Sequence, residues 1–170
     1  MSEKKLNPVL LEKAARVKLL LMDCDGVLTD GRLYYSERGE EIKVFHVRDG
    51  QGLVNWHRAG FISGIITGRK SKILEVRAAE LGISHLRQAS GDKVSDFERM
   101  IKEEKVSAAE TAFIGDDLVD LPVLEKAGLA VAVADAVGEL FPKADYITQT
   151  EGGRGAVREV IDLLFLAKGL

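Results

Sequence analysis

The sequence contains a single cysteine, Cys24, so no disulfide can form within the chain. This agrees with a reducing compartment, where structural disulfides are rare. The chain also lacks any apolar run that approaches the roughly 20 residues of a membrane-spanning helix. The polar segment 1–9 has no apolar stretch typical of a signal peptide. We therefore expect a cytoplasmic protein without a membrane partner, in which Cys24 is a small core side chain and not a reactive thiol.

The sequence also has no excess of positive charge. The 24 Lys and Arg residues stand against 27 Asp and Glu residues, which gives a net charge of −3. Proteins that bind nucleic acid usually carry a basic patch, so we expect no nucleic acid partner. The composition, 46% hydrophobic and 30% charged, is that of an ordinary soluble globular protein. A length of 170 residues fits one domain with a substantial core, and we expect residues 1–170 to form it.

Strand-like and helix-like segments alternate along most of the chain. The expected strands are 17–22, 61–66, 83–86, 111–114, 129–133 and 146–147. The expected helices are 7–16, 49–60, 71–81, 92–104, 120–126 with Gly128 as the residue that ends it, and 156–167. Such alternation predicts right-handed βαβ units, and thus an α/β fold with a doubly wound, Rossmann-like parallel sheet.

One segment departs from this alternation. Residues 33–35 and 42–47 flank the polar stretch 36–41, which contains a glycine. This pattern predicts a β-hairpin with a polar tip. The hairpin would project from the edge of the sheet at which strand 17–22 ends.

The apolar run 17–22 ends abruptly in two carboxylates, Asp23 and Asp25, which are separated by one residue. A short, nearly continuous apolar run is typical of a strand that helices cover on both faces, although a buried helix has the same pattern. In an open parallel sheet, ligands bind beyond the carboxyl ends of the strands. Asp23 and Asp25 would lie there, unless the motif is merely an acidic turn.

Further polar residues follow other strand-like runs or begin a helix. Thr67 follows the run 62–66, Lys93 stands at a helix start, and Asp116 and Asp117 follow the run 111–115. Several carboxylates around one cleft would repel one another and raise their pKa values, which a divalent cation relieves. An all-oxygen ligand set suits Mg²⁺ better than Zn²⁺. The alternative is a set of acidic loop tips that only keep the protein soluble.

The order of these residues resembles the four motifs of the haloacid dehalogenase superfamily. The motifs are Asp-x-Asp-Gly-Val-Leu-Thr at 23–29, Ile-Ile-Thr-Gly-Arg at 65–69, Lys93, and Gly-Asp-Asp-Leu-Val-Asp at 115–120. The resemblance implies a phosphatase in which Asp23 attacks phosphorus and Asp25 acts as the acid and base.

The same resemblance implies a ligand set for the metal and the phosphate. Mg²⁺ would be held by Asp23, the backbone carbonyl of Asp25, and Asp116. Thr67, Gly68 and Lys93 would contact the transferring group. Asp117 and Asp120 would either bind the metal through water or orient Lys93.

Members of this superfamily usually recognise substrates through a cap domain inserted after the first or the second motif. The corresponding segments here, 30–48 and 69–92, are too short to hold one. In its length, its hairpin 31–47 and the motifs at 48–52, 115–122 and 152–159, the chain resembles the capless phosphatase family that hydrolyses 3-deoxy-D-manno-octulosonate 8-phosphate in lipopolysaccharide precursor synthesis. This implies a homotetramer with the hairpins at its centre, in which a neighbour covers each cleft.

The family resemblance also suggests how the sugar acid is bound. Arg69 is the best candidate for a contact with its carboxylate. Arg77 and His85 are weaker candidates, for which solvated helix and loop positions are the favoured alternative. A glycine-rich segment that contains Gly152, Gly153 and Gly155 either begins a helix or closes a neighbouring cleft.

Other functions stay open at this point. A phosphatase of a nine-carbon keto-sugar acid, of the deaminoneuraminate 9-phosphate type, would share the same core. A non-catalytic sugar-phosphate binding module is a second alternative, although both Asp23 and Asp25 are present. A phospho-accepting receiver domain also combines an Asp cluster with Thr, Lys and Mg²⁺, but there the phosphorylated Asp follows a middle strand, whereas Asp23 follows the first.

Overall fold

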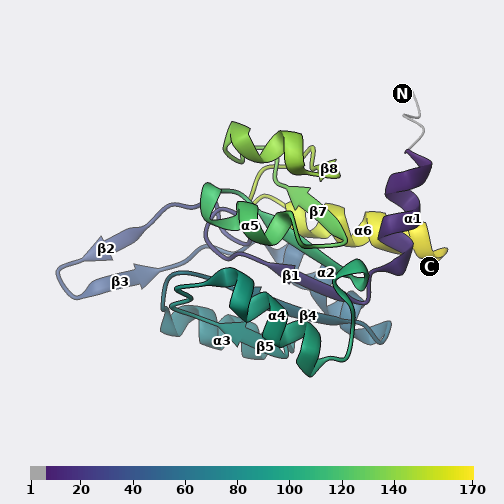
Figure 1. The fold of residues 1–170 in the computed structure, drawn as a ribbon. Helices are drawn as coiled ribbons and strands as arrows, with labels where there is room; N and C mark the ends of the chain where they lie inside the picture. The colour runs from purple at the N-terminus through teal and green to yellow at the C-terminus, as the bar shows by residue number, and fades with distance from the viewer. Residues whose placement is uncertain (1–6) are drawn as a thin grey trace.

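The computed structural model, which describes residues 7–170, contains a six-stranded parallel sheet with helices on both faces (Figure 1). The strand order is β5-β4-β1-β6-β7-β8, and all five neighbouring pairs are parallel. These strands are β1 (Leu19–Met22), β4 (Ile62–Ile66), β5 (His85–Arg87), β6 (Thr111–Gly115), β7 (Leu129–Ala132) and β8 (Tyr146–Ile147). The doubly wound α/β fold is therefore confirmed. Residues 1–6 of the polar amino-terminal segment lie outside the described residues.

Two layers of helices cover the sheet. Helices α2, α3 and α6 lie on one face, with α1 packed against α6, and α4 and α5 lie on the other (Figure 1). Their bounds are α1 Pro8–Arg16, α2 Val47–Arg58, α3 Lys72–Leu81, α4 Lys93–Glu103, α5 Leu121–Leu124 and α6 Ala156–Lys168. Short 3₁₀ helices occupy Ala108–Glu110, Leu118–Asp120 and Gly138–Lys143. Within residues 7–170, no helix combines the length and the apolar character needed to cross a bilayer.

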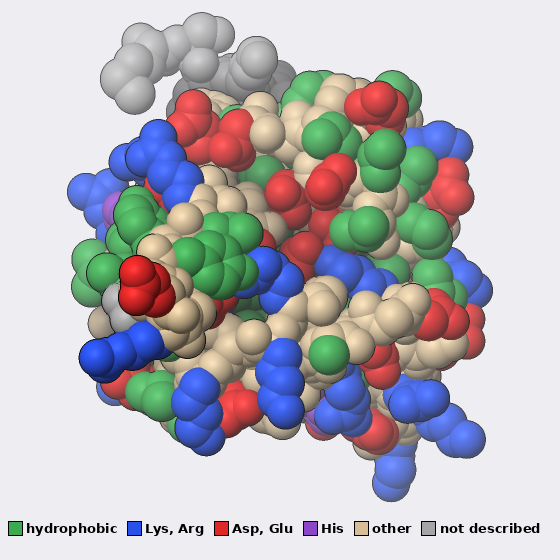
Figure 2. Space-filling view, turned by 90° about the vertical axis from the view of Figure 1, so that its left-hand side faces the viewer, with side chains coloured by type: hydrophobic (Ala, Val, Ile, Leu, Met, Phe, Trp, Pro, Cys, Tyr) green, Lys and Arg blue, Asp and Glu red, His purple; other side chains and the backbone are tan. Residues whose placement is uncertain are grey.

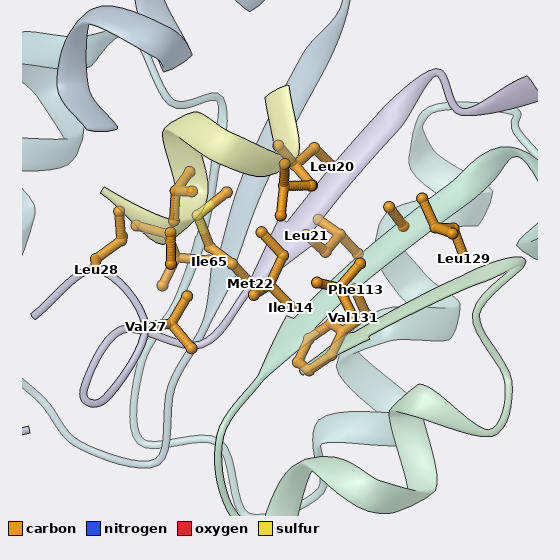
Figure 3. Packing of buried hydrophobic residues seen from close by; sticks show 14 of the residues in the cluster. Leu20, Leu21, Met22, Val27, Leu28, Ile65, Phe113, Ile114, Leu129 and Val131 are labelled. Carbon is orange, nitrogen blue, oxygen red and sulfur yellow. The ribbon is translucent and has the colours of Figure 1, made fainter. Parts of the chain in front are cut away.

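Strand β1 is the centre of the core because it pairs with β4 on one side and β6 on the other. Every side chain of β1 is fully buried, as the continuous apolar run predicts. Figure 3 shows Leu20, Leu21 and Met22 packed among side chains such as Ile65 and Phe113 from the flanking strands. Burial of each large apolar side chain contributes about 1.5–3 kcal/mol to folding. This rigid centre fixes the position at which β1 ends.

The hairpin exists, but the predicted extents of its strands were wrong. Its strands are β2 (Tyr34–Ser36) and β3 (Gly39–Ile42), joined by a two-residue turn, so the predicted tip 36–41 is mostly strand. The segment 43–46 is not a strand but leads into α2, which begins at Val47 and not at residue 49. The imidazole of His46 accepts a hydrogen bond from the amide of Arg48 and so caps this helix.

The predicted helix 120–126 is also shorter than expected. Helix α5 ends at Leu124, so Gly128 does not terminate it. Gly128 instead lies against the backbone of Ala109, where an added Cβ would come within 2.5 Å of the carbonyl oxygen. The glycine is therefore required for the close approach of two chain segments and not for a helix end.

Candidate active site

Three of the predicted site residues follow the three central strands of the sheet. Asp23 follows β1, Thr67 follows β4 and Asp116 follows β6. Because β1 lies between β4 and β6 and all three are parallel, their carboxyl ends meet at one edge. A pocket of about 500 Å³ opens there. It is lined by Asp23, Asp25, Thr67, Gly68, Arg69, Ser90, Gly91, Asp92, Lys93, Val94, Asp116, Asp117, Val119 and Pro122.

Lys93 links two of the carboxylates in this pocket. Its Nζ lies 2.7 Å from Oδ2 of Asp23 and 2.7 Å from Oδ1 of Asp120. The side chain of Asp92 accepts hydrogen bonds from the amides of Val94 and Ser95, which fixes the start of α4 and therefore the position of Lys93. The predicted position of Lys93 at the start of a helix is therefore confirmed.

Asp120 is fully buried and hydrogen-bonded through both carboxylate oxygens. Oδ1 faces Lys93, while Oδ2 accepts hydrogen bonds from the amides of Asp116 and Asp117 at 3.0 and 3.4 Å. The sequence left open whether Asp120 binds metal through water or orients Lys93. A carboxylate that is engaged in this way is well placed to orient Lys93. The side chain of Asp117 lies further out and caps the 3₁₀ turn by accepting from the amide of Leu118.

Burial and mutual repulsion perturb the acidic groups of the pocket. Burial and the charge of Asp120 raise the pKa of Asp23 to about 6, although Lys93 opposes this. Burial and the charges of Asp120 and Asp23 raise the pKa of Asp116 to about 8. Burial alone would lower the pKa of Lys93, but the charges of Asp120 and Asp23 raise it above its usual value. The pocket therefore holds more negative charge than one lysine neutralises.

This excess charge fits a bound cation. Carboxylate oxygens of Asp23, Asp116 and Asp120 lie within 4.8 Å of one another. Oδ1 of Asp116 is buried and accepts no hydrogen bond from any described residue. Gly26 has a φ of +86° and lets Asp116 approach, because an added Cβ would lie 1.9 Å from Oδ2. Oxygen donors of this type suit Mg²⁺. Asp23 and Asp116 lie where metal ligands would lie, and their role as ligands stays a prediction, as does that of the backbone carbonyl of Asp25.

A second group of charges surrounds the carboxylate of Asp25. Oδ1 forms an ion pair with Lys43, and Oδ2 lies 3.4 Å from Nε of Arg69. Arg69 also donates from Nη2 to Glu40 at 2.8 Å and to the hydroxyl of Tyr35 at 2.6 Å. Lys43, Glu40 and Tyr35 belong to the hairpin or directly follow it. The hairpin therefore contacts two residues of the pocket lining, Asp25 and Arg69, from outside the pocket.

Figure 2 looks onto this edge of the molecule, from which the hairpin projects toward the viewer. Acidic side chains gather near the centre of the face, with lysine and arginine side chains beside them. This is the arrangement expected for a pocket that binds a metal ion and a phosphate together.

Comparisons with known proteins agree with this geometry. The family model described as haloacid dehalogenase-like hydrolase matches residues 59–161. A curated relative, the 3-deoxy-D-manno-octulosonate 8-phosphate phosphatase of Salmonella typhimurium strain LT2, is 49% identical over 96% of this chain and 87% of its own length. The chain belongs to the haloacid dehalogenase-like hydrolase family.

Solved structures of similar haloacid dehalogenase-like hydrolases have the same fold. The 3-deoxy-D-manno-octulosonate 8-phosphate phosphatase of Yersinia pestis has a TM-score of 0.93 and 46% identity, covering 95% of this chain and 88% of that one. The enzyme of the same name from Moraxella catarrhalis was solved in complex with a magnesium ion, a phosphate ion and a KDO molecule. It has a TM-score of 0.91 and 41% identity, covering 94% of this chain and 92% of that one.

Two of the weaker candidates lie away from the pocket of this haloacid dehalogenase-like hydrolase. The guanidinium of Arg77 lies over the ring of Phe45, and its Nη1 donates to Glu80 at 3.3 Å. His85 is buried at the start of β5, the end of the strand opposite the pocket, and its Nε2 contacts Glu104. His85 is therefore not a solvated loop residue, and the structure brings neither residue to Asp23.

The glycine-rich segment packs on its own chain. Gly153 donates its amide hydrogen to the carbonyl of Val27 at 2.9 Å, and the amide of Gly152 donates to Asp135 at 2.8 Å. Gly155 is the residue before α6. The segment thus begins a helix and supports the loop that carries Asp25, while closure of a neighbouring cleft stays a prediction.

Sequence reasoning missed Lys43 and Glu40 as parts of the site. Both lie in the segment that was predicted only to form a hairpin. A weak signal exists in Lys43, which interrupts an otherwise apolar run, but the pattern does not indicate which residue it contacts. Cys24 is buried as expected, and burial raises the pKa of its thiol, in keeping with a core side chain.

Proposed function

We propose that the protein is a Mg²⁺-dependent phosphatase that hydrolyses 3-deoxy-D-manno-octulosonate 8-phosphate to the free sugar acid and phosphate. The observation that carries this proposal is the buried contact of Asp23 with Lys93 beside Oδ1 of Asp116, a buried oxygen that has no hydrogen-bond partner among the described residues. It supports the proposal because the three side chains that would act as nucleophile, phosphate-binding cation and metal ligand, Asp23, Lys93 and Asp116, line one pocket. The similarity to enzymes named for this substrate supports its identity.

The first chemical step forms an aspartyl-phosphate. A carboxylate oxygen of Asp23 attacks phosphorus and the ester P–O bond breaks. Asp25 then gives a proton to the leaving oxygen, which departs as the alcohol. Asp23, Asp116 and the backbone carbonyl of Asp25 would hold Mg²⁺, which would neutralise charge on the phosphoryl group. Asp25 contacts Lys43 and Arg69 and not Asp23, so its carboxylate is separate from the nucleophile.

The second step returns the enzyme to its starting state. Asp25, now ionised, takes a proton from water, and the water oxygen attacks phosphorus. The bond between phosphorus and the Asp23 oxygen breaks, which releases phosphate and the free carboxylate. The hydroxyl of Thr67, the backbone at Gly68 and the ammonium of Lys93 line the pocket and would hold the phosphoryl oxygens throughout.

Arg69 is the residue that we propose for binding the substrate carboxylate. It lines the pocket and contacts Glu40 of the hairpin. In the structure, Nη2 of Arg69 donates a hydrogen bond to Glu40. Desolvation would raise the pKa of Glu40, but hydrogen bonds from Ser71 and Arg69 lower it below its usual value. A second carboxylate bound to Arg69 would share or replace this contact.

A panel of phosphorylated substrates tests the proposed function. We expect the highest kcat/KM for 3-deoxy-D-manno-octulosonate 8-phosphate, with deaminoneuraminate 9-phosphate at least about tenfold lower, a difference of about 1.4 kcal/mol in transition-state binding. An equal or higher value for the nine-carbon substrate would assign the enzyme to that substrate instead. A protein that binds both compounds without releasing phosphate would be the non-catalytic sugar-phosphate binding module.

We also propose that the protein is a single domain that works in the cytoplasm as a homotetramer with the hairpins at its centre. The hairpin exposes several large apolar side chains, which an assembly would bury: Leu33, Tyr34, Tyr35, Ile42 and Val44. We expect light scattering to give about four times the 18.6 kDa mass of one chain. A mass of one chain at micromolar concentration would contradict the tetramer.

A further inference from the structure

Both carboxylate oxygens of Asp25 face cations, and these come from different parts of the chain. Lys43, which directly follows β3, forms an ion pair with Oδ1. Arg69, which follows β4, has its Nε 3.4 Å from Oδ2. The side chain of Lys43 is only 2% exposed, whereas that of Arg69 is 35% exposed. Lys43 is therefore the more shielded and more fixed of the two partners.

We propose that Lys43 is a positioning residue that holds the carboxylate of Asp25 where the leaving oxygen is protonated. This proposal rests on the proposed phosphatase function. In an in-line displacement the leaving oxygen departs on the side of phosphorus opposite the nucleophile. The acid must therefore stay away from Asp23 during attack. Lys43 draws Asp25 toward the hairpin, while Lys93 holds Asp23 from α4.

The burial of Lys43 makes this contact selective. A buried ammonium needs anionic partners, and among the described side chains Asp25 and Glu40 pair with it, with Oε2 of Glu40 3.8 Å from Nζ. Glu40 is itself held by Ser71 and Arg69. Glu40 would lose these hydrogen bonds if it moved, so it stays in place beside Lys43. The ammonium of Lys43 therefore has a fixed position from which it holds Asp25. Through Lys43, the end of the hairpin thus sets the position of the acid.

A role in positioning the acid depends on the leaving group of the substrate. A sugar alcohol leaves poorly unless it is protonated, whereas p-nitrophenol leaves readily as the anion. Loss of Lys43 should therefore slow hydrolysis of an alkyl phosphate and spare that of an aryl phosphate. A residue that only stabilised the fold would affect both substrates to the same extent.

The test compares kcat/KM of the wild type and Lys43→Met on 3-deoxy-D-manno-octulosonate 8-phosphate and on p-nitrophenyl phosphate, with saturating Mg²⁺. We expect a loss of about 10²-fold on the sugar-acid phosphate, mainly in kcat, and less than about threefold on the aryl phosphate. In an Asp25→Asn background, Lys43→Met should lower kcat/KM on the sugar-acid phosphate by no more than about twofold further, because Lys43 acts through Asp25. Lys102→Met, at an exposed position of α4 outside the pocket lining and the hairpin, should behave as the wild type.

Equal losses on both substrates, or no loss on either, would overturn the role of Lys43 while leaving the phosphatase function in place. So would a full additional loss in the Asp25→Asn background. If the wild type hydrolysed neither substrate, both proposals would fail. Should Lys43→Met not fold, as judged by circular dichroism, Lys43→Gln serves for the same comparison because it also removes the charge.

Discussion

We expect Asp23→Asn to lower kcat by about 10⁴-fold or more, because the amide cannot form the bond to phosphorus. The substitution keeps the volume of the side chain in a site that is only 7% exposed. Lys93 keeps its contact with Asp120 at 2.7 Å, so the start of α4 should stay in place. The loss should therefore be chemical and not a consequence of unfolding. Phosphate release under saturating substrate and Mg²⁺ measures it.

A matched control for this substitution is Asp162→Asn on α6. Asp162 is exposed, pairs with Arg158 and is not part of the pocket lining. The control should retain the wild-type rate, and both variants should keep the circular dichroism spectrum of the wild type. Turnover by Asp23→Asn within about tenfold of the wild type would exclude Asp23 as the nucleophile.

Removal of Mg²⁺ should stop turnover as completely as loss of the nucleophile. Without the cation, burial and repulsion raise the pKa values of Asp23 to about 6 and of Asp116 to about 8. The anionic substrate would then meet a pocket whose carboxylates are unneutralised or protonated, and neither form assists attack on phosphorus. Excess chelator should abolish phosphate release, and added Mg²⁺ should restore it. Full activity in excess chelator would contradict the role of the metal.

The metal-free protein should also become less stable as the pH rises. Between about pH 4 and pH 8, the folded state holds protons on Asp23 and Asp116 that the unfolded state has lost. The unfolded state binds fewer protons, so the free energy of unfolding falls with increasing pH. Mg²⁺ keeps these groups ionised in the folded state. The increase in Tm on adding Mg²⁺ should thus be larger at about pH 8 than at about pH 5.5.

Asp116→Asn is the variant that isolates this effect. It removes the carboxyl group with the pKa of about 8 but leaves its shape, so the chelated variant should lose less Tm than the chelated wild type between these two pH values. A Tm of the chelated wild type that rises over this range would contradict the assigned repulsion.

The sheet was predictable because each strand corresponds to a short apolar run in the sequence. Strand β1 is buried on both faces and reads as an unbroken apolar run, and the polar residues that follow β1, β4 and β6 meet at one edge because the strands are parallel. The cluster of Asp23, Thr67, Lys93 and Asp116 follows from the same rule. Local sequence also placed Lys93 at a helix start, since Asp92 is a strong helix cap.

Features that depend on contacts between distant segments were not predictable. The bounds of the hairpin strands differ from the predicted ones because a two-residue turn sets their register. Their apolar side chains are exposed, so no buried core indicates the register in the sequence. Gly128 has the same sequence signature as a helix end, although it serves a close approach to Ala109. The pair of Lys43 and Asp25 joins residues 18 positions apart, and no local pattern records it.

Borohydride reduction of the acid-quenched phosphoenzyme tests most directly whether Asp23 accepts the phosphoryl group. Reduction of an aspartyl-phosphate yields homoserine, which peptide mass spectrometry assigns to one residue. The Asp25→Asn variant with p-nitrophenyl phosphate and Mg²⁺ should accumulate the intermediate, because water activation is lost. We predict homoserine at position 23, dependent on both substrate and Mg²⁺. Homoserine at another aspartate, or an unmodified Asp23 while p-nitrophenol is released, would contradict this mechanism.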